Sequence, residues 1–240
     1  MSLPLFFHDE DFVLHSQIRL GEETARHVVL VLRRQAGDKL ELTNGKGVSA
    51  TATIVLAEKK KLEVLIEELT QHELPPAGLH LCVAFTKNAG RNEWLLEKAI
   101  ELGVRSIVPV VASRTERERI RYDRWRNIMI AALIQSRQYF LPQLAEATTL
   151  HDILQRFNGT PQKLVGHCIE GASRHPLSEV CKKGIETVVL IGPEGDFTPE
   201  EVETCYNEGF TGISLVYQRL RTETAAMAVC AYFNLINHDY

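Results

Sequence analysis

The sequence predicts a two-domain α/β protein, in which a small β-barrel precedes a larger domain built on a mostly parallel sheet. Short strand patterns with tight turns fill the first part of the chain, and a Pro-Pro-containing linker follows them. Strand and helix patterns then alternate to the end of the 240 residues. Such alternation is typical of a parallel sheet covered by helices. We therefore expect domains at residues 1–73 and 74–240.

The first domain is expected to be rich in strands. Alternating or β-branched apolar residues predict strands at Asp38–Leu42, Val48–Leu56 and Lys61–Glu67. Asn44–Gly47 (NGKG) is a good turn between the first two strands. Glu22–Leu32 (EETARHVVLVL) predicts a short helix that leads into a further strand. Thr70–Gly78 (TQHELPPAG) is polar and then Pro-rich, and we expect the linker there.

The second domain is expected to alternate strands with helices. The expected strands are Leu79–Thr86, Val104–Val111, Lys163–Cys168, Thr187–Ile191 and Gly212–Val216. The expected helices are Arg91–Gly103, Tyr122–Phe140, Pro176–Lys183, Pro199–Glu208 and Thr222–Ile236. Gly103 stands where a C′ glycine ends a helix, and the second helix stops before Pro142.

The composition is that of an ordinary globular chain. It is 45% hydrophobic and 24% charged, which suffices for a real core. No apolar run approaches the roughly 20 residues that cross a bilayer, and the amino terminus has no signal-peptide pattern. We therefore expect a cytoplasmic protein without membrane contact. The five cysteines show no C-x-x-C spacing, which favours reduced, buried thiols.

The charge pattern offers one local candidate for nucleic-acid contact. A net charge of −4 excludes a basic footprint over the whole chain. The segment Ser113–Arg126 (SRTERERIRYDRWR) nevertheless carries six arginines, diluted by three acidic residues. These arginines are Arg114, Arg117, Arg119, Arg121, Arg124 and Arg126. The segment is either an RNA contact or a solvated charged face with local ion pairs.

The stretch VVLIGPEGDFTPEE (188–201) predicts a ligand loop at the end of a buried strand. In open α/β sheets, ligands bind beyond the carboxyl ends of the strands, and Gly192 and Gly195 let the backbone approach a ligand closely. Thr198 is a suitable N-cap for the following helix, whose first turn contains Glu200 and Glu201. These carboxylates argue against a phosphate group at that helix. The alternative is an ordinary turn between a strand and a helix.

The segment QRLRTETAA (218–226) follows the last expected strand. It places Arg219 and Arg221 at the mouth of the sheet, and Thr222 is a candidate cap for the last helix. That helix is apolar on nearly all sides, so it should be buried. As the last element of a sheet domain it would normally lie at the surface, which favours a homodimer.

Together these segments resemble the RsmE family, SPOUT-class methyltransferases that methylate N3 of a uridine in 16S rRNA. The resemblance is carried by IGPEG, RLRTETA, WLLEKAIELGV after Lys87, QSRQYFLP, and by FFHDE, RHVVLVLRRQAGDKLEL and TNGKG in the first domain. It covers nearly the whole chain. Departures from the usual family pattern are Asp196 after IGPEG, Val216-Tyr217 before the RLRTETA segment, and Leu5 near the amino terminus.

The resemblance implies a PUA-like RNA-binding barrel, a trefoil-knotted second domain, and an active site at a dimer interface. It also implies an S-adenosyl-L-methionine pocket formed by the IGPEG loop and the loop before the RTETA helix, with His167 as a weaker contact. The implied cofactor residues are His167, Leu190, Ile191, Gly192, Pro193, Glu194, Gly195, Leu215, Gln218, Leu220, Arg221, Thr222, Thr224 and Ala225.

Methylation of uridine N3 needs a general base or a cation that stabilises the deprotonated uracil. Glu194 or Glu223 could accept the proton, although Glu223 could instead complement the helix dipole. Arg219 or Arg221 could stabilise the uracil anion. No cysteine nucleophile is required, and the histidine spacing predicts no metal site.

The RNA partner is expected to be 16S rRNA in the assembled small subunit, because an acidic protein should bind free RNA weakly. The candidate RNA contacts are Arg26, Arg33, Arg34, Lys87, Arg91, Arg114 and Arg137. Two alternatives stay open: a non-catalytic RNA-binding or ribosome-assembly protein, and the same class of enzyme with another RNA target.

Overall fold

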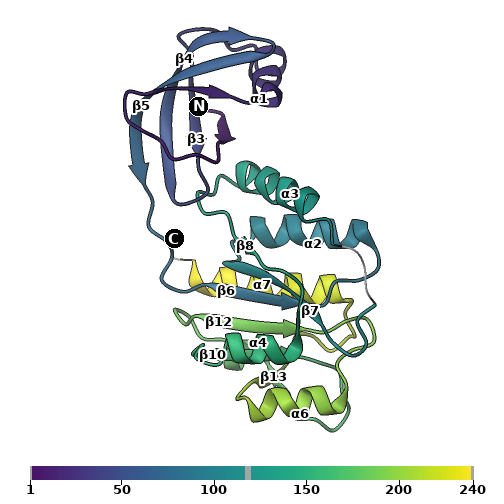
Figure 1. Ribbon diagram of the computed structural model, residues 1–240. Helices are drawn as coiled ribbons and strands as arrows, with labels where there is room; N and C mark the ends of the chain where they lie inside the picture. Colours follow the sequence, from purple (N-terminus) through teal and green to yellow (C-terminus); the bar gives the residue numbers. More distant parts are fainter. Residues whose placement is uncertain (1, 117–119, 239–240) are drawn as a thin grey trace. The chain divides into compact units, whose positions relative to one another are not determined.

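The computed structural model describes residues 2–116 and 120–238, which form two compact units (Figure 1). The first unit consists of Met1–Leu74 and Leu133–Leu141, and the second of Pro75–Ala132 and Pro142–Tyr240. The sequence predicts two domains that are each continuous in sequence, whereas the first unit also includes the distant segment Leu133–Leu141. Arg117 and Arg119 of the arginine-rich segment lie outside the described residues.

The first unit is built on a five-stranded sheet with the order β1-β3-β4-β5-β2. Its pairs are antiparallel except for β1 with β3, which is parallel. The predicted strands β3, β4 and β5 are confirmed, and β1 and β2 are additional. The inward residues Leu62, Val64 and Ile66 alternate along β5 and are fully buried. The strands are β1 (Leu5–Phe7), β2 (Gln17–Leu20), β3 (Lys39–Thr43), β4 (Val48–Glu58) and β5 (Lys61–Gln71).

The predicted strand after the short helix is wrong. The helix α1 (Glu22–Arg26) continues directly into a π-helical turn, η1 (His27–Val31). Ala25 and Val28 are three residues apart and are fully buried, whereas Val31 is 66% exposed. Residues of this segment therefore enter the core with the spacing of a helix. The β-branched residues in HVVLV had indicated a strand instead.

The distant segment Leu133–Leu141 docks onto the turn Asn44–Gly47. The Gly47 amide donates to the Tyr139 carbonyl (2.8 Å), and the Leu141 amide donates to the Gly45 carbonyl (2.7 Å). A Cβ on Gly47 would lie 2.4 Å from the Phe140 ring, so this glycine is required for close approach.

The Tyr139 ring continues this docking by stacking on His72. The two ring centroids are 3.7 Å apart and the rings are 7° from parallel. The Tyr139 hydroxyl donates to Glu41 (2.7 Å), and burial raises the pKa of Tyr139. A segment from the far half of the sequence thus completes the first unit.

The second unit contains a mostly parallel sheet with the order β11-β13-β10-β12-β6-β7-β8, with β9 paired to β7. Every pairing between its named strands is parallel, as the alternation of strands and helices predicts. Short strands β8, β9 and β11 are additional to those predicted. The strands are β6 (Leu79–Val83), β7 (Ser106–Val111), β8 (Gln143–Leu144), β9 (Thr148–Thr149), β10 (Gln162–Gly166), β11 (His175–Pro176), β12 (Thr187–Ile191) and β13 (Thr211–Ser214).

Helices cover this sheet on both faces (Figure 1). Val188 and Leu190 of β12 share a buried cluster with α4 and α6, so the alternating Val189 faces the side on which α7 packs beside α2. The helices are α2 (Ala89–Glu101), α3 (Tyr122–Gln135), α4 (Leu150–Arg156), α5 (Leu177–Val180), α6 (Pro199–Asn207) and α7 (Thr222–Asn237).

Two helix ends share one capping geometry but differ in how well the sequence predicts them. Gly103 has φ +72°, and the Val104 amide bonds to the Ala99 carbonyl, which confirms the predicted C′ glycine. Helix α3 ends at Gln135, before the predicted Phe140, because Arg137 takes the same left-handed conformation (φ +54°). An arginine gives no sequence signal for such an end.

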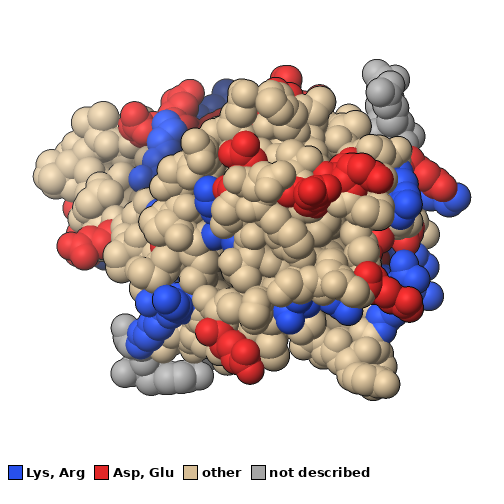
Figure 2. All heavy atoms as spheres, turned by 90° about the horizontal axis from the view of Figure 1, so that it is seen from below, with Lys and Arg blue, Asp and Glu red and all other residues tan. Residues whose placement is uncertain are grey.

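The surface of the described residues mixes charges of both signs. Figure 2 shows one face on which Lys and Arg alternate with Asp and Glu across uncharged surface. This mixture agrees with the small net charge of −4. Within residues 2–116 and 120–238, no helix has both the length and the apolar character that a bilayer crossing requires.

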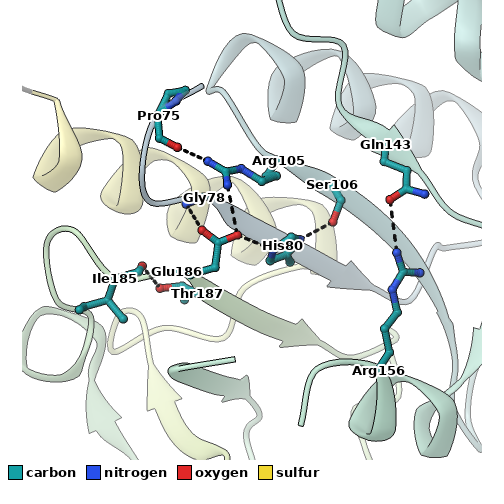
Figure 3. Close-up of polar contacts among 10 residues, drawn as sticks. All are labelled: Pro75, Gly78, His80, Arg105, Ser106, Gln143, Arg156, Ile185, Glu186 and Thr187. Carbon is teal, nitrogen blue, oxygen red and sulfur yellow. Dashed lines mark hydrogen bonds and ion pairs between the residues drawn. The ribbon is translucent and has the colours of Figure 1, made fainter. Parts of the chain in front are cut away.

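A polar cluster fastens the amino-terminal edge of the second sheet (Figure 3). Glu186, just before β12, accepts hydrogen bonds from the Gly78 amide (2.6 Å) and from His80 Nε2 (2.7 Å). Burial lowers the pKa of His80 although Glu186 opposes this, so His80 is neutral at pH 7 and its Nδ1 accepts from the Ser106 hydroxyl (2.7 Å). Arg105 adds an ion pair to Glu186 at 3.4 Å. The cluster ties the linker end to β6, β7 and β12.

Glu186→Gln should destabilise the second unit by about 1–3 kcal/mol, because an amide nitrogen would face one of the donors that now bond to the carboxylate. Urea unfolding followed by tryptophan fluorescence would report this, since Trp94 and Trp125 both lie in the second unit. Glu203→Gln on the exposed side of α6 is the matched control and should change little. Equal stability of the two variants would contradict a fastening role for Glu186.

Candidate functional site

Three loops meet at the carboxyl edge of the second sheet and enclose a pocket of about 590 Å³. They follow β10, β12 and β13, which are neighbours in the sheet and run parallel. Gly166 at the end of β10 pairs with Ile191 of β12 and Ile213 of β13, so the three strands end nearly level. Parallel strands thereby bring three separate segments to one site.

The loop after β10 forms one wall and is held by a hydroxyl of α6. His167 is 5% exposed, and its Nε2 lies 2.8 Å from the Tyr206 hydroxyl, which donates to the Ser173 carbonyl (2.7 Å). The Ile169 amide donates to His167 Nδ1 (3.3 Å), so Nε2 carries the proton. Burial lowers the pKa of His167, in agreement with this neutral form. A Cβ on Gly212 would lie 2.4 Å from the Ser173 carbonyl oxygen, so glycine is needed there.

The loop after β12 is the tight turn that the sequence predicts. The Asp196 amide donates to the Pro193 carbonyl (2.9 Å). Thr198 is the N-cap of α6, as predicted, and it forms a capping box with Glu201. A Cβ on Gly192 would lie 3.1 Å from the ring of Phe197, which is fully buried beneath the loop. Glu194 is exposed at the pocket.

The loop after β13 leads into α7 and is joined to the previous loop by one hydrogen bond. The Thr222 hydroxyl donates to the Gly192 carbonyl (3.0 Å). The predicted capping role of Thr222 is wrong, because Arg221 occupies the N-cap position and no side chain caps the helix. The positive end of the α7 dipole therefore lies at the pocket, which Thr222 and Ala225 line.

Charges of both signs line the pocket. The carboxylates are Glu170, Glu194 and Asp196, and the guanidinium groups are Arg174, Arg219 and Arg221. The acidic first turn of α6 is not among the lining residues. A pocket with this lining suits a ligand that carries a cation and an anion at different positions.

Most of the cofactor residues implied by the resemblance line this pocket. They are His167, Ile191, Gly192, Pro193, Glu194, Leu215, Gln218, Leu220, Arg221, Thr222 and Ala225, together with the catalytic candidate Arg219. Three others do not line it: the Leu190 side chain lies in the core, the Gly195 carbonyl accepts from Arg114 (2.7 Å), and Thr224 is exposed in the first turn of α7 but is not among the lining residues.

Several lining residues were missed by sequence reasoning. They are Gly166, Cys168, Glu170, Arg174, Asp196, Ile213 and Ser214. Val216 and Tyr217 also line the pocket and lie inside the expected loop Leu215–Ala225. Asp196 directly follows the expected loop Leu190–Gly195, so its neighbours in sequence were a usable signal. The loop after β10 carries no comparable motif, and only its position between two ligand loops reveals it.

The general-base candidate Glu223 faces α2 and is not among the residues that line the pocket. Glu223 is only 7% exposed, and its Oε1 lies 3.5 Å from Arg91 Nε. Within the described part of the chain, its Oε2 has no hydrogen-bond partner. Glu194, which lines the pocket, is therefore the better placed carboxylate.

Three RNA candidates lie at the same sheet edge, near Glu194. Lys87 forms a hydrogen-bonded ion pair with Glu116 (2.9 Å). The hydrogen bond to Glu116 raises the pKa of Lys87, and the negative charges of Glu116 and Glu194 add to this effect. Arg114 donates to the Gly195 carbonyl, and Arg91 pairs with Glu223. Lys87 and Arg91 follow β6, which is next to β12, and Arg114 follows β7, the neighbour of β6 on its other side.

The other RNA candidates belong to the first unit. Arg33 is exposed with φ +53°, Arg26 pairs with Glu22, and Arg34 lies 4.0 Å from Asp38. Arg137 donates to the Leu3 carbonyl and pairs with Glu41. Its guanidinium is thus engaged in closing the first unit.

The cysteines differ in accessibility. Cys82, Cys181, Cys205 and Cys230 are buried as predicted, and burial raises the pKa of Cys181 to about 11 and of Cys205 to about 12. The prediction is wrong for Cys168, which is exposed at the pocket, because it follows β10 on the loop that forms the wall. Among the described residues, no group of His, Cys, Asp and Glu is arranged to hold a metal ion.

The chain matches two family models and is similar to proteins of known structure. Residues 72–234 match an RNA methyltransferase domain, and residues 20–67 match an RNA methyltransferase PUA domain. A probable rRNA-methyltransferase from Porphyromonas gingivalis is 33% identical, with a TM-score of 0.91 over 98% of both chains.

Two further relatives carry a more specific name. Ribosomal RNA small subunit methyltransferase E from Neisseria gonorrhoeae, solved with S-adenosyl methionine bound, is 28% identical, with a TM-score of 0.84 over 98% of both chains. The Bacillus subtilis protein of that name is 26% identical over 86% of this chain and 85% of its own. By these matches, and by the SPOUT-type sheet with a PUA-like first unit, the chain belongs to the RNA methyltransferase family, within the RsmE group that its motifs resemble.

Proposed function

We propose that this chain transfers a methyl group from S-adenosylmethionine to N3 of a uridine in 16S rRNA. The observation that carries the proposal is the shared pocket of the Gly192–Asp196 turn and the Arg219–Thr222 segment, joined by the bond from Thr222 to Gly192. The cofactor is supported by the bound ligand of the Neisseria gonorrhoeae relative. The substrate is supported by the name that the relatives share.

The pocket suits this cofactor in size and charge. Its volume of about 590 Å³ lies within the roughly 300–1,000 Å³ of small-molecule sites. When bound, S-adenosylmethionine would supply an electrophilic methyl group on a sulfonium cation. Glu170 and Glu194 offer compensating negative charge, and backbone groups around Gly192 offer hydrogen bonds.

In the chemical step, the carboxylate of Glu194 and the guanidinium groups of Arg219 and Arg221 have different roles. Glu194 is exposed at the pocket, where it can accept the proton of uridine N3. Arg219 and Arg221 are exposed on the opposite loop and can stabilise the negative charge that spreads over the uracil carbonyl oxygens. The uncapped start of α7 adds the positive end of a helix dipole.

The candidate RNA contacts are local cations. Lys87, Arg91 and Arg114 lie at the sheet edge of the second unit, and Arg26, Arg33 and Arg34 belong to the first unit. The mixed charges of Figure 2 favour weak, salt-dependent binding of free RNA. We therefore propose the assembled small subunit as the substrate and the cytoplasm as the location of the protein.

The proposal is tested by cofactor binding and by rRNA analysis. Calorimetry should detect S-adenosylmethionine binding, and rRNA from a strain that lacks the gene should lose one N3-methyluridine that the intact chain restores. Absence of binding at millimolar cofactor would favour a non-catalytic RNA-binding protein. Unchanged N3-methyluridine in 16S rRNA would indicate another RNA target.

Arg221→Ala should lower kcat by about 100-fold while changing the Kd of S-adenosylmethionine less than about threefold, because charge stabilisation is realised in the transition state. Arg221→Lys keeps the positive charge and should recover part of the rate. Single-turnover rates and calorimetry on the three proteins provide the comparison. Equal losses of kcat and of cofactor affinity would reassign Arg221 to cofactor binding.

We also propose a homodimer through the outer side of α7. Leu235 is 67% exposed there, and Met227, Ala228 and Ala231 are partly exposed on the same helix. An apolar helix side of this kind is stabilised by burial against a second copy.

Light scattering should therefore report a dimer at micromolar concentration, and Leu235→Arg should shift it toward monomer by placing a charge in the interface. Val55→Arg, at a 41% exposed position of the first unit, should leave the mass unchanged. A monomeric wild-type protein would overturn the dimer.

A further inference from the structure

Asp196 connects two walls of the pocket beyond the end of the sheet. The pairing of β10 with β12 ends where Gly166 lies opposite Ile191. Past that point, Asp196 Oδ2 accepts a hydrogen bond from the amide of Cys168 at 2.7 Å. The other oxygen, Oδ1, accepts from the Phe197 amide at 2.9 Å and fixes the carboxylate on its own loop.

The backbone of Asp196 is held in a conformation that few residues adopt. Its φ is +63°, in the left-handed region where an L side chain is disfavoured and glycine is not. Asp is one of the few non-glycine residues that occupy this region with tolerable strain. A carboxylate at this position therefore supplies a contact that glycine could not make.

The described residues offer no backbone substitute for this contact. No backbone–backbone hydrogen bond among them joins residues 167–174 to residues 192–197. Tyr206 of α6 also holds the first loop, at His167 Nε2 (2.8 Å) and at the Ser173 carbonyl (2.7 Å), whereas the bond from the Cys168 amide to Asp196 joins this loop to the turn after β12. The carboxylate also lines the pocket, where both loops would contact a ligand.

We propose that Asp196 is a positioning residue that sets the separation of the two pocket walls and so prepares the pocket for S-adenosylmethionine. The inference rests on the proposed function. It assigns the carboxylate to the Cys168 amide and not to the sulfonium charge. If the two loops are already held at the right separation in the free protein, the ligand does not have to order them when it binds, and the affinity is higher for that reason.

Three variants and two ligands test the assignment. Asp196→Gly removes the bridge and suits φ +63°, so backbone strain cannot explain a loss. Asp196→Asn keeps one oxygen that can accept from the Cys168 amide, but it removes the charge and leaves an NH2 group facing the Phe197 amide, which now donates to Oδ1. S-adenosylhomocysteine, a neutral thioether, serves beside the cationic S-adenosylmethionine. His15→Gly is the matched control, because His15 is exposed in the first unit with φ +61°.

Calorimetry should show that Asp196→Gly binds both ligands roughly 10-fold more weakly, the scale of one charge-assisted hydrogen bond. Asp196→Asn, which keeps one of the two acceptors, should lose less affinity than Asp196→Gly and lose it equally for both ligands, and His15→Gly should not differ. Hydrogen exchange of the Cys168 amide without ligand should be faster in Asp196→Gly than in Asp196→Asn. Thermal unfolding of each variant checks that the fold is intact.

Other results overturn the assignment in distinguishable ways. Wild-type affinity in Asp196→Gly would remove any positioning role. A loss confined to S-adenosylmethionine in Asp196→Asn would show a direct charge contact with the sulfonium instead. A wild-type protein that binds neither ligand would defeat the proposed function itself.

Discussion

The candidate site depends on one constraint, the parallel pairing of β10 with both of its neighbours. Because β12, β10 and β13 run in one direction and end almost level, their following loops must leave from one edge. If any one of these strands ran in the opposite direction, its following loop would lie at the other edge of the sheet, one strand length from the pocket. Gly166, which pairs with residues of both neighbouring strands, is the point from which the pocket opens.

Within the sheet, backbone hydrogen bonds connect the strands; beyond its edge, side-chain hydrogen bonds connect the loops. Thr222, Asp196 and Tyr206 each bond to a backbone group of another segment, and together they connect all three loops. The opposite edge carries the compact cluster around Glu186 and His80, which fastens strand starts to one another. One edge thus serves stability, while the other retains exposed charges and open backbone where a ligand can bind.

Much of the second unit follows from its sequence, because strand and helix periodicity and turn residues coincide there. The strand Thr187–Ile191 and the N-cap at Thr198 are reproduced as predicted. The helix end at Arg137 and the π-helical turn at His27–Val31 are not, since neither arginine nor β-branched residues signal those conformations. The sequence motifs also place the loops after β12 and β13, whereas the wall formed by Cys168 and Arg174 requires knowledge of strand order, which local patterns do not contain.

The docking of Leu133–Leu141 onto the Asn44–Gly47 turn makes the first unit discontinuous in sequence. A fragment that stops near Leu74 would leave the face of His72 without Tyr139 and the Glu41 carboxylate without its hydroxyl and guanidinium partners. During synthesis the first unit therefore stays incomplete until residue 141 has emerged, by which time much of the second unit's chain has also been made. Attempts to exchange the PUA-like unit between relatives would accordingly need three splice points, after Leu74, before Leu133 and after Leu141, and not one.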